Sequence, residues 1–220
     1  MVVKELPLSE TPLEPPVAKP ANIKAEFTEL VKMVVWFLVL FFFLKWAVIE
    51  GYEVQGPSME PTLWNNERIL VFKLPHKLSQ WVPGYQPIQP GDIVVFKRPE
   101  DGDKRYVKRV VAEGPPSERG NKVDARAQDD TGPEPVALRI ERGRVFVNNQ
   151  RVEESYLPVE IEESFDDSDR AELHAGEYYV MGDHRSVSKD SRVFGAVEDD
   201  KVIGKAVLRF WPLSRFGLLK

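Results

Sequence analysis

The sequence predicts a mainly β protein that follows a single membrane-spanning helix. One apolar run, from Met33 to Ile49, contains no charged residue except Lys45. After this run, short β-branched segments recur between prolines and glycines, which is the pattern of strands rather than of helices. With 220 residues, the chain is long enough for the helix and for one sizeable domain or two small ones.

The composition excludes several classes of partner and site. The net charge of −5 and the absence of a Lys/Arg block argue against nucleic acid as a partner. Without cysteine the chain has no disulfide, no thiolate nucleophile and no cysteine-based zinc site. The three histidines, His76, His174 and His184, show no spacing typical of metal ligands. We therefore expect neither a metal nor a cofactor.

The amino-terminal segment has two parts with different compositions. Residues 1–24 carry prolines at positions 7, 12, 15, 16 and 20 and few large apolar residues, so we expect a disordered tail. Residues 25–50 are predicted to form the transmembrane anchor. As a helix, the apolar run would be about 25 Å long, which is at the short end for crossing a hydrocarbon core of about 30 Å. Lys45 lies near the end of the run and can extend its amine to the headgroups. Trp36, Trp46 and Tyr52 suit the two interfaces.

The basic residues around the apolar run predict its orientation. Lysines at positions 19, 24 and 32 precede the run, whereas the next basic residue after Lys45 is Arg68. By the positive-inside rule the amino terminus is cytoplasmic, and the chain after Gly51 lies on the outer face of the cell membrane. An internal energy-transducing membrane is the alternative. No small-x-small site follows the run, which argues against a cleaved signal peptide.

The rest of the chain is predicted to form strands. Strand patterns lie at Arg68–Phe72, Asp92–Lys97, Tyr106–Val111, Tyr178–Met181 and Val202–Phe210. A hairpin is expected where Asn148-Asn149 separates Arg144–Val147 from Gln150–Val152, because asparagine tolerates the positive φ of a type I′ turn. Residues 114–142 are rich in proline, glycine and charge, and we expect them to be irregular. The predicted domains are therefore one β domain, 51–113 with 176–214, and an inserted subdomain, 114–175.

One serine lies in an unusual setting just after the apolar run. Ser58 sits between Gly56-Pro57 and Pro61-Thr62, on backbone that cannot continue as helix or strand. Its hydroxyl can therefore project into a cleft. Taken alone, the same stretch also fits an ordinary exposed turn.

A catalytic serine needs a base, and the sequence offers two types. His184, in Gly182-Asp183-His184-Arg185, is the histidine candidate. A lysine base must be buried among apolar groups, because its ordinary pKa of about 10.4 keeps it charged at neutral pH. Lys108 shares one strand face with Tyr106 and Val110, which fits this need. A solvated basic face is the alternative for this strand, and other lysines stay open as the base: Lys73, Lys97 and Lys104.

Four segments, in order, resemble the motifs of type I signal peptidases, which are membrane-anchored Ser-Lys proteases. The segments are Gly56–Leu63, Gly91–Phe96, Arg105–Val111 and Gly182–Gly195, and the resemblance extends from the apolar run to about residue 212. It implies Ser58 as the nucleophile, Lys108 as the general base and Ser188 as the residue that orients the lysine. It further implies bracing roles for Asp190, Arg192 and Arg109. Asp183 lies in the same motif as Asp190 and Arg192.

The resemblance also implies a fold and a function. The fold would be a catalytic β domain of several small sheets, of the signal-peptidase/LexA type, with an inserted second subdomain. The function would be to cleave amino-terminal signal peptides after Ala-x-Ala-like sites, from preproteins delivered by the export machinery to the lipid bilayer. The self-cleaving LexA-type repressors are a competing class, but they are soluble and bind DNA. A membrane-tethered binding domain is the non-enzymatic alternative.

The sequence departs from the family pattern at two places. Some members carry serine or threonine at the position of Gly56, and there the hydroxyl helps to hold the oxyanion. With glycine, the oxyanion would depend on backbone donors, mainly the amide of Ser58. In the last motif, His184, Ser186 and Val187 replace the common residues, which leaves Ser188 in place but changes its surroundings.

Overall fold

The computed structural model describes most of the chain, in two units. The described residues are 23–44, 48–74, 76, 88–102, 104–115, 133–158 and 168–219. The units comprise Met1–Phe42 and Phe43–Lys220. The expected disordered tail and the stretch Lys45–Ala47 at the end of the apolar run lie outside the described residues.

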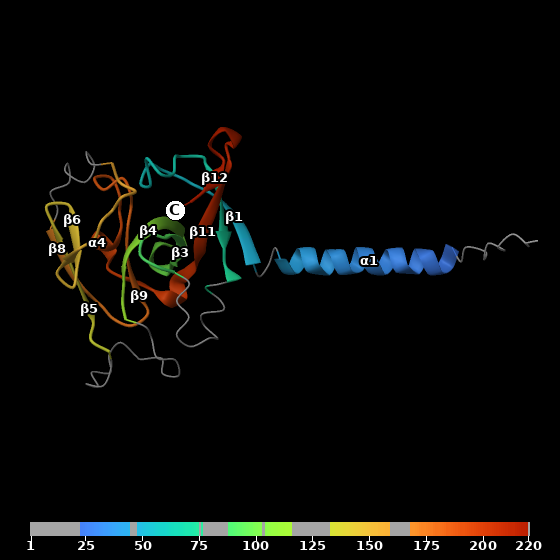
Figure 1. Ribbon diagram of the computed structural model, residues 1–220, viewed down its shortest axis with the longest axis horizontal. Coiled ribbons are helices and arrows are strands. Elements are labelled where there is room, and N and C mark those ends of the chain that lie inside the picture. The colour runs from blue at the N-terminus through green and yellow to red at the C-terminus, as the bar shows by residue number, and fades with distance from the viewer. Residues whose placement is uncertain are drawn as a thin grey trace, which may run out of the picture. The chain divides into compact units, whose positions relative to one another are not determined.

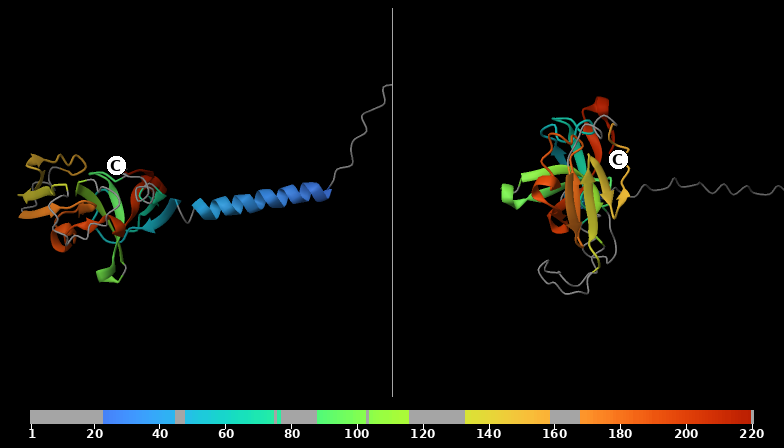
Figure 2. Two further views of the ribbon diagram at one scale, coloured as in Figure 1. Left: turned by 90° about the horizontal axis from the view of Figure 1, so that it is seen from below. Right: turned by 90° about the vertical axis from the view of Figure 1, so that its left-hand side faces the viewer.

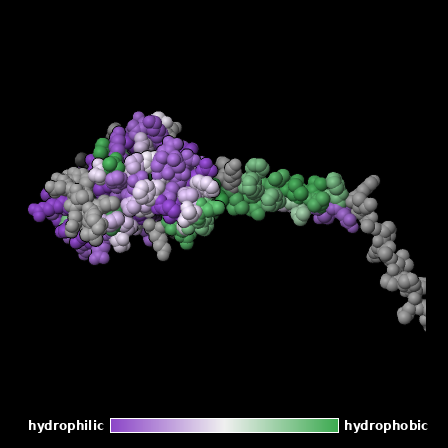
Figure 3. Space-filling view, turned by 90° about the horizontal axis from the view of Figure 1, so that it is seen from above, coloured by the Kyte–Doolittle hydropathy of each residue, from purple (hydrophilic) through white to green (hydrophobic). Residues whose placement is uncertain are grey.

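The amino-terminal unit contains helix α1 (Ile23–Phe43) up to Phe42; the helix is drawn in blue in Figure 1. Its side chains from Glu26 onward are all exposed, Trp36 by 73%. Figure 3 shows a hydrophobic surface along most of this helix and hydrophilic residues near its amino-terminal end. Among the described residues, no helix is both long enough and apolar enough to cross a membrane.

Within the described residues the larger sheet has eight strands, and each pair of neighbours is antiparallel. Its strands are β1 (Ile49–Glu53), β2 (Arg68–Phe72), β3 (Ile93–Arg98), β4 (Lys104–Glu113), β9 (Glu177–Met181), β10 (Val197–Glu198), β11 (Val202–Trp211) and β12 (Gly217–Leu218). They are ordered β1-β2-β11-β3-β4-β9-β10, and β12 pairs with β11. The order brings β4 and β9, far apart in sequence, side by side at the centre of the site described below.

The smaller sheet has four strands among the described residues and lies at one end of the larger unit, in yellow and orange in Figure 2 (left). Its strands are β5 (Val136–Glu141), β6 (Arg144–Val147), β7 (Gln150–Arg151) and β8 (Ser168–Leu173), in the order β7-β6-β5-β8. The predicted hairpin joins β6 to β7, and Asn148 and Asn149 have φ of 48° and 65°, as a type I′ turn requires.

The helical turns of the larger unit are short. They are η2 (Pro99–Asp101), α4 (Ser191–Phe194), η3 (Asp199–Lys201) and η4 (Leu213–Arg215). Two of them contact the candidate site: the amino-terminal cap of α4 is Asp190, and Arg215 of η4 pairs with Glu67 on the loop that carries Ser58.

Two sequence expectations differ from the structure. Ile49 and Glu50, expected in the anchor helix, begin β1, because pairing with β2 outweighs the apolar run: Ile49 opposes Phe72. Within the expected irregular stretch 114–142, β5 forms, since its alternating pattern buries Leu138 and Ile140. The surrounding residues 116–132 lie outside the described part of the chain.

The core joins both sheets. Two buried clusters lie within the larger sheet. A third combines Val111 and Met181 of the larger sheet with Leu138 and Val145 of the smaller one. The mainly β fold class is confirmed, and the strands form two sheets where several small ones were expected. The smaller sheet is therefore packed directly behind the strands that carry the site.

Gly204 gives a test of the packing between β2 and β11. A Cβ at this position would lie 2.5 Å from the carbonyl oxygen of Phe72 and 3.0 Å from the Cα of Lys73, so backbone must move. We expect Gly204→Ala to lower the free energy of unfolding by about 1–3 kcal/mol, the usual cost of overpacking. The measurement is urea unfolding of the full chain in detergent, followed by tryptophan fluorescence.

The matched control is Gly217→Ala in β12, where an added Cβ meets no atom within 4 Å. Its effect should stay within about 0.5 kcal/mol. Equal effects of the two substitutions would contradict the packing described for Gly204.

Candidate active site

Ser58 lies on the loop between β1 and β2, and this loop is fastened to the core on both sides of the serine. Met59 and Leu63 are 0% exposed. The amide of Leu63 donates to the carbonyl of Met59 at 2.8 Å. At the base of the loop, Val54 and Glu67 are joined by a backbone hydrogen bond of 2.8 Å. The core anchors leave the Ser58 side chain partly exposed.

A buried carboxylate fixes the second half of the same loop. Glu67 is 3% exposed, accepts the amide of Trp64 at 3.0 Å and forms an ion pair with Arg215 at 2.8 Å. Arg209 reaches Glu67 at 3.4 Å and also donates to the carbonyl of Thr62 at 2.8 Å. The carboxy-terminal strand and turn thus hold the loop that carries the serine.

Lys108 projects from β4 directly to the serine. Its Nζ donates to Ser58 Oγ at 2.6 Å and to the carbonyl of Val107 at 3.0 Å. The lysine is 3% exposed, although β4 begins at a solvated end of the sheet. The other candidate lysines are placed elsewhere: Lys73 pairs with Glu50, and Lys97 and Lys104 are exposed.

Burial changes the acidity of this lysine. Removal of the ammonium from water lowers the pKa of Lys108 to about 8, although the carboxylates of Asp190 and Asp183 act in the opposite direction. A substantial fraction of the amine is therefore neutral near pH 8, and a neutral amine can accept a proton from the hydroxyl in contact with it.

Gly182 allows the turn from Gly182 to Asp190 to approach the loop that carries Ser58. A Cβ on Gly182 would lie 2.4 Å from the carbonyl oxygen of Ser58 and 2.2 Å from the Oγ of Ser188. Only glycine leaves room for both. The Oγ of Ser188 is buried, and among the described residues it has no hydrogen-bond partner. The structure thus places Ser188 beside the serine loop without a direct bond to Lys108.

Asp190 and Arg192 hold this segment in place. Asp190, which is 0% exposed, accepts the amide of Gly182 at 2.9 Å and caps α4. Its carboxylate pairs with Arg192 at 2.7 Å. The same guanidinium donates to the carbonyl of Arg185 at 2.7 Å. Both ends of the turn from Gly182 to Asp190 are therefore tied together.

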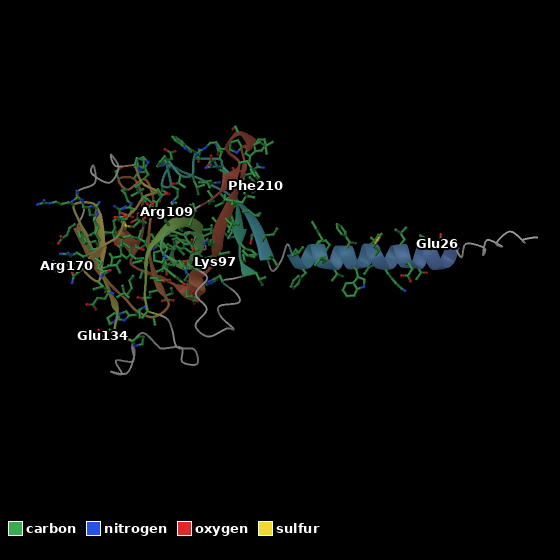
Figure 4. The ribbon with its side chains drawn as sticks, viewed as in Figure 1. Glu26, Lys97, Arg109, Glu134, Arg170 and Phe210 are labelled. Carbon is green, nitrogen blue, oxygen red and sulfur yellow. The ribbon has the colours of Figure 1, made fainter. Side chains whose placement is uncertain are left out.

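Arg109, on the other side of β4, connects the sequence motifs to one another. Figure 4 labels it within the body of the larger unit. It forms a buried, two-pronged pair with Asp183 at 2.9 and 2.8 Å. It also donates to the carbonyl of Gly91 at 2.7 Å and to the hydroxyl of Thr62 at 3.3 Å. One side chain thus contacts three of the four sequence motifs.

Sequence reasoning missed Glu154 and Tyr156, which follow the β6–β7 hairpin. Glu154 forms a buried ion pair with Arg185. The Tyr156 hydroxyl donates to Glu154 at 2.5 Å, and the Cζ of Arg109 lies 3.9 Å from the centre of its ring. The only available signal was Arg185 itself, since an arginine beside a buried motif requires a carboxylate partner.

The histidine candidate contributes through its backbone. The His184 amide donates to the carbonyl of Ser58 at 3.1 Å. Its ring Nδ1 is buried and lacks a hydrogen-bond partner among the described residues. Gly56 has a φ of 88°, and its amide donates to the Asn65 side chain at 2.8 Å. No acceptor for the Ser58 amide occurs within the part of the chain that the structure describes.

Comparisons with known proteins identify the family of the chain. The family model described as signal peptidase, peptidase S26, matches residues 27–129 and 131–211. The chain belongs to this family. A signal peptidase IB of Staphylococcus aureus is 31% identical over 210 residues, covering 88% of this chain and 94% of that protein. A signal peptidase I of Leptolyngbya laminosa is 28% identical, covering 97% of this chain and 94% of that protein.

A solved structure is also similar. The crystal structure of a signal peptidase I from Enterococcus faecalis V583 has a TM-score of 0.40 and 21% identity, and it covers 55% of this chain and 97% of that chain. The family match and the curated relatives identify the chain as a signal peptidase I enzyme.

Gly182 provides the sharpest test of the site's packing. Gly182→Ala should push Ser188 and the Ser58 carbonyl apart, and a shift of about 1 Å at a catalytic group can cost about 100-fold in rate. We expect a kcat loss of that order for preprotein cleavage in detergent.

Gly204→Ala serves as the control, because it strains a remote part of the sheet and should leave kcat within about twofold. Comparable loss of kcat in both variants would show that the effect is one of general stability.

Proposed function

We propose that this protein is a membrane-anchored serine endopeptidase that removes amino-terminal signal peptides from exported preproteins, with Ser58 and Lys108 as a Ser-Lys dyad. The observation that carries the proposal is the 2.6 Å contact between the buried amine and the serine hydroxyl. It occurs in a chain whose family is that of the signal peptidases. Burial of the amine supplies the lowered pKa that such a base needs.

In the proposed reaction, neutral Lys108 takes the proton of Ser58 as Oγ attacks the scissile carbonyl carbon. The tetrahedral intermediate collapses with cleavage of the C–N bond, and the Lys108 ammonium returns its proton to the departing amine. Water then attacks the acyl-enzyme, with Lys108 again taking a proton. Deacylation releases the signal peptide as a carboxylic acid and returns the proton to Ser58.

The oxyanion of the intermediate would be held by backbone. The Ser58 amide is the candidate donor, since among the described residues nothing accepts its hydrogen bond. The Gly56 amide is already bonded to Asn65. The proposed oxyanion hole therefore depends on the serine's own amide.

The remaining residues are proposed to support the dyad. Ser188 would orient the Lys108 amine, and its buried hydroxyl beside Gly182, which has no hydrogen-bond partner among the described residues, is available for that bond. Asp190, Arg192 and Arg109 would brace the turn through their buried ion pairs. We also propose that 51–113 and 176–214 form the catalytic domain around an inserted subdomain, 114–175.

Membrane attachment is proposed to reside in α1 and the residues that follow it. The side chains from Met33 to Leu44 are all apolar and all exposed, which suits a lipid bilayer. The amino terminus would be cytoplasmic and the catalytic domain outside, where the export machinery delivers preproteins. An extended substrate would add to a strand edge, with pockets small enough to select Ala-x-Ala-like residues.

The dyad is tested by Ser58→Ala and Lys108→Met in preprotein cleavage by the full chain in detergent. Loss of a nucleophile or general base should lower kcat/KM by about 10²–10⁴-fold or more. The matched control is Lys97→Met, an exposed lysine that should keep wild-type turnover. Near-normal turnover by either dyad variant would refute the mechanism, and an inert wild type on several preproteins would favour a binding domain.

The pH profile tests the base itself. Activity needs neutral Lys108, so kcat/KM should rise with pH through a pKa of about 8 and level off above it. Cleavage rates between about pH 6 and 10 measure this. If His184 were the base, His184→Ala would abolish activity; we expect His184→Ala to remain active.

A further inference from the structure

We propose that Glu154 and Tyr156 are positioning residues of the active site, a role that rests on the proposed function. They lie after the β6–β7 hairpin, outside the four motifs that carry the catalytic residues. Their side chains nevertheless reach the turn from Gly182 to Asp190. The following contacts connect them to Ser58.

The first contact is the ion pair between Glu154 and Arg185. Both side chains are 2% exposed, and the carboxylate accepts from both terminal nitrogens of the guanidinium. Such a pair has defined geometry because two parallel hydrogen bonds fix the plane of the arginine. Glu154 therefore sets where the third nitrogen of Arg185 points.

That third nitrogen holds Gly182. The Nε of Arg185 donates to the Gly182 carbonyl at 3.1 Å, while the Gly182 amide donates to Asp190 at 2.9 Å. Both peptide groups around Gly182 are thus fixed by buried charges. Because Gly182 packs against the Ser58 carbonyl and the Ser188 hydroxyl, its position sets theirs.

Tyr156 joins this carboxylate to the second bracing pair. Its hydroxyl donates to Glu154 at 2.5 Å, and its ring covers the guanidinium of Arg109. Arg109 in turn holds Asp183 and the Thr62 hydroxyl on the serine loop. The two residues after the hairpin therefore act on both sides of the dyad without touching it.

Glu154→Gln tests this role, because glutamine keeps the shape and one acceptor but removes the charge and the paired geometry. We expect kcat to fall by about 100-fold, as small displacements of catalytic groups do, with KM within about threefold of wild type. Tyr156→Phe, which removes only the hydroxyl, should lower kcat by about tenfold or less. A smaller loss in Tyr156→Phe than in Glu154→Gln is part of the prediction.

Two matched controls separate positioning from stability. Glu141→Gln makes the same change in β5 of the smaller sheet, on an exposed pair with Arg139. Tyr178→Phe removes another tyrosine hydroxyl bonded to a carboxylate, that of Asp199 at 3.1 Å. Both should keep wild-type kcat, and Tyr178→Phe should lower the melting temperature about as much as Tyr156→Phe.

A second readout does not require activity. Hydrogen exchange of peptides covering residues 182–190 should quicken by about tenfold or more in Glu154→Gln, because weakening the Glu154–Arg185 pair loosens the turn whose amides bond to Asp190, Ser58 and His184. Exchange in β2 should not change.

Wild-type kcat in Glu154→Gln, or equal kcat losses in Tyr156→Phe and Tyr178→Phe, would overturn the inference while leaving the dyad intact. An inert wild type would instead refute the proposed function, and unchanged exchange at 182–190 would then refute the positioning role independently. If Glu154→Gln does not fold, the comparison of Tyr156→Phe with Tyr178→Phe decides the matter.

Discussion

The burial of the Lys108 amine is the constraint on which the site depends. An ammonium group in this position would lose most of its hydration, and the cost lowers its pKa to about 8. The fold keeps the amine buried despite this cost, because β4 is held between β3 and β9 and cannot turn the lysine outward. The resulting amine has one hydroxyl partner, Ser58, within the described part of the chain. Desolvation of the amine and the geometry of β4 together thus place a lysine of lowered pKa against the Ser58 hydroxyl.

The same site contains two buried carboxylates that oppose this effect. Asp183 and Asp190 both favour the charged form of Lys108, yet both are needed to hold the turn that follows β9. Each is paired with an arginine, Arg109 or Arg192, at 2.8 and 2.7 Å. A carboxylate whose charge is offset by a guanidinium acts less strongly on a third group. The ion pairs therefore keep the structural benefit of the carboxylates while limiting their effect on the pKa of Lys108.

The sequence was sufficient for local features and insufficient for long-range ones. Strand patterns and the Asn-Asn turn predicted the main strands and the hairpin, because alternation and turn residues are local signals. The burial of Lys108 could not be deduced from its basic neighbours, since Lys104 and Lys108 share a face and only their depth along the sheet separates them. Glu154 was missed for the same reason. Its partner Arg185 lies in another part of the chain, and only the packing of the two sheets reveals the pair.

The departures of the last motif from the family pattern have a structural explanation. His184 serves the site through its backbone, with its amide on the Ser58 carbonyl and its own carbonyl accepting from Val187 and Ser188. The Ser186 and Val187 side chains are exposed and take no part in these bonds. Substitution at these three positions therefore preserves every hydrogen bond that fixes the turn. The positions where a side chain itself bonds or packs within the turn, Asp183, Arg185, Ser188, Asp190 and Arg192, are those that match the pattern.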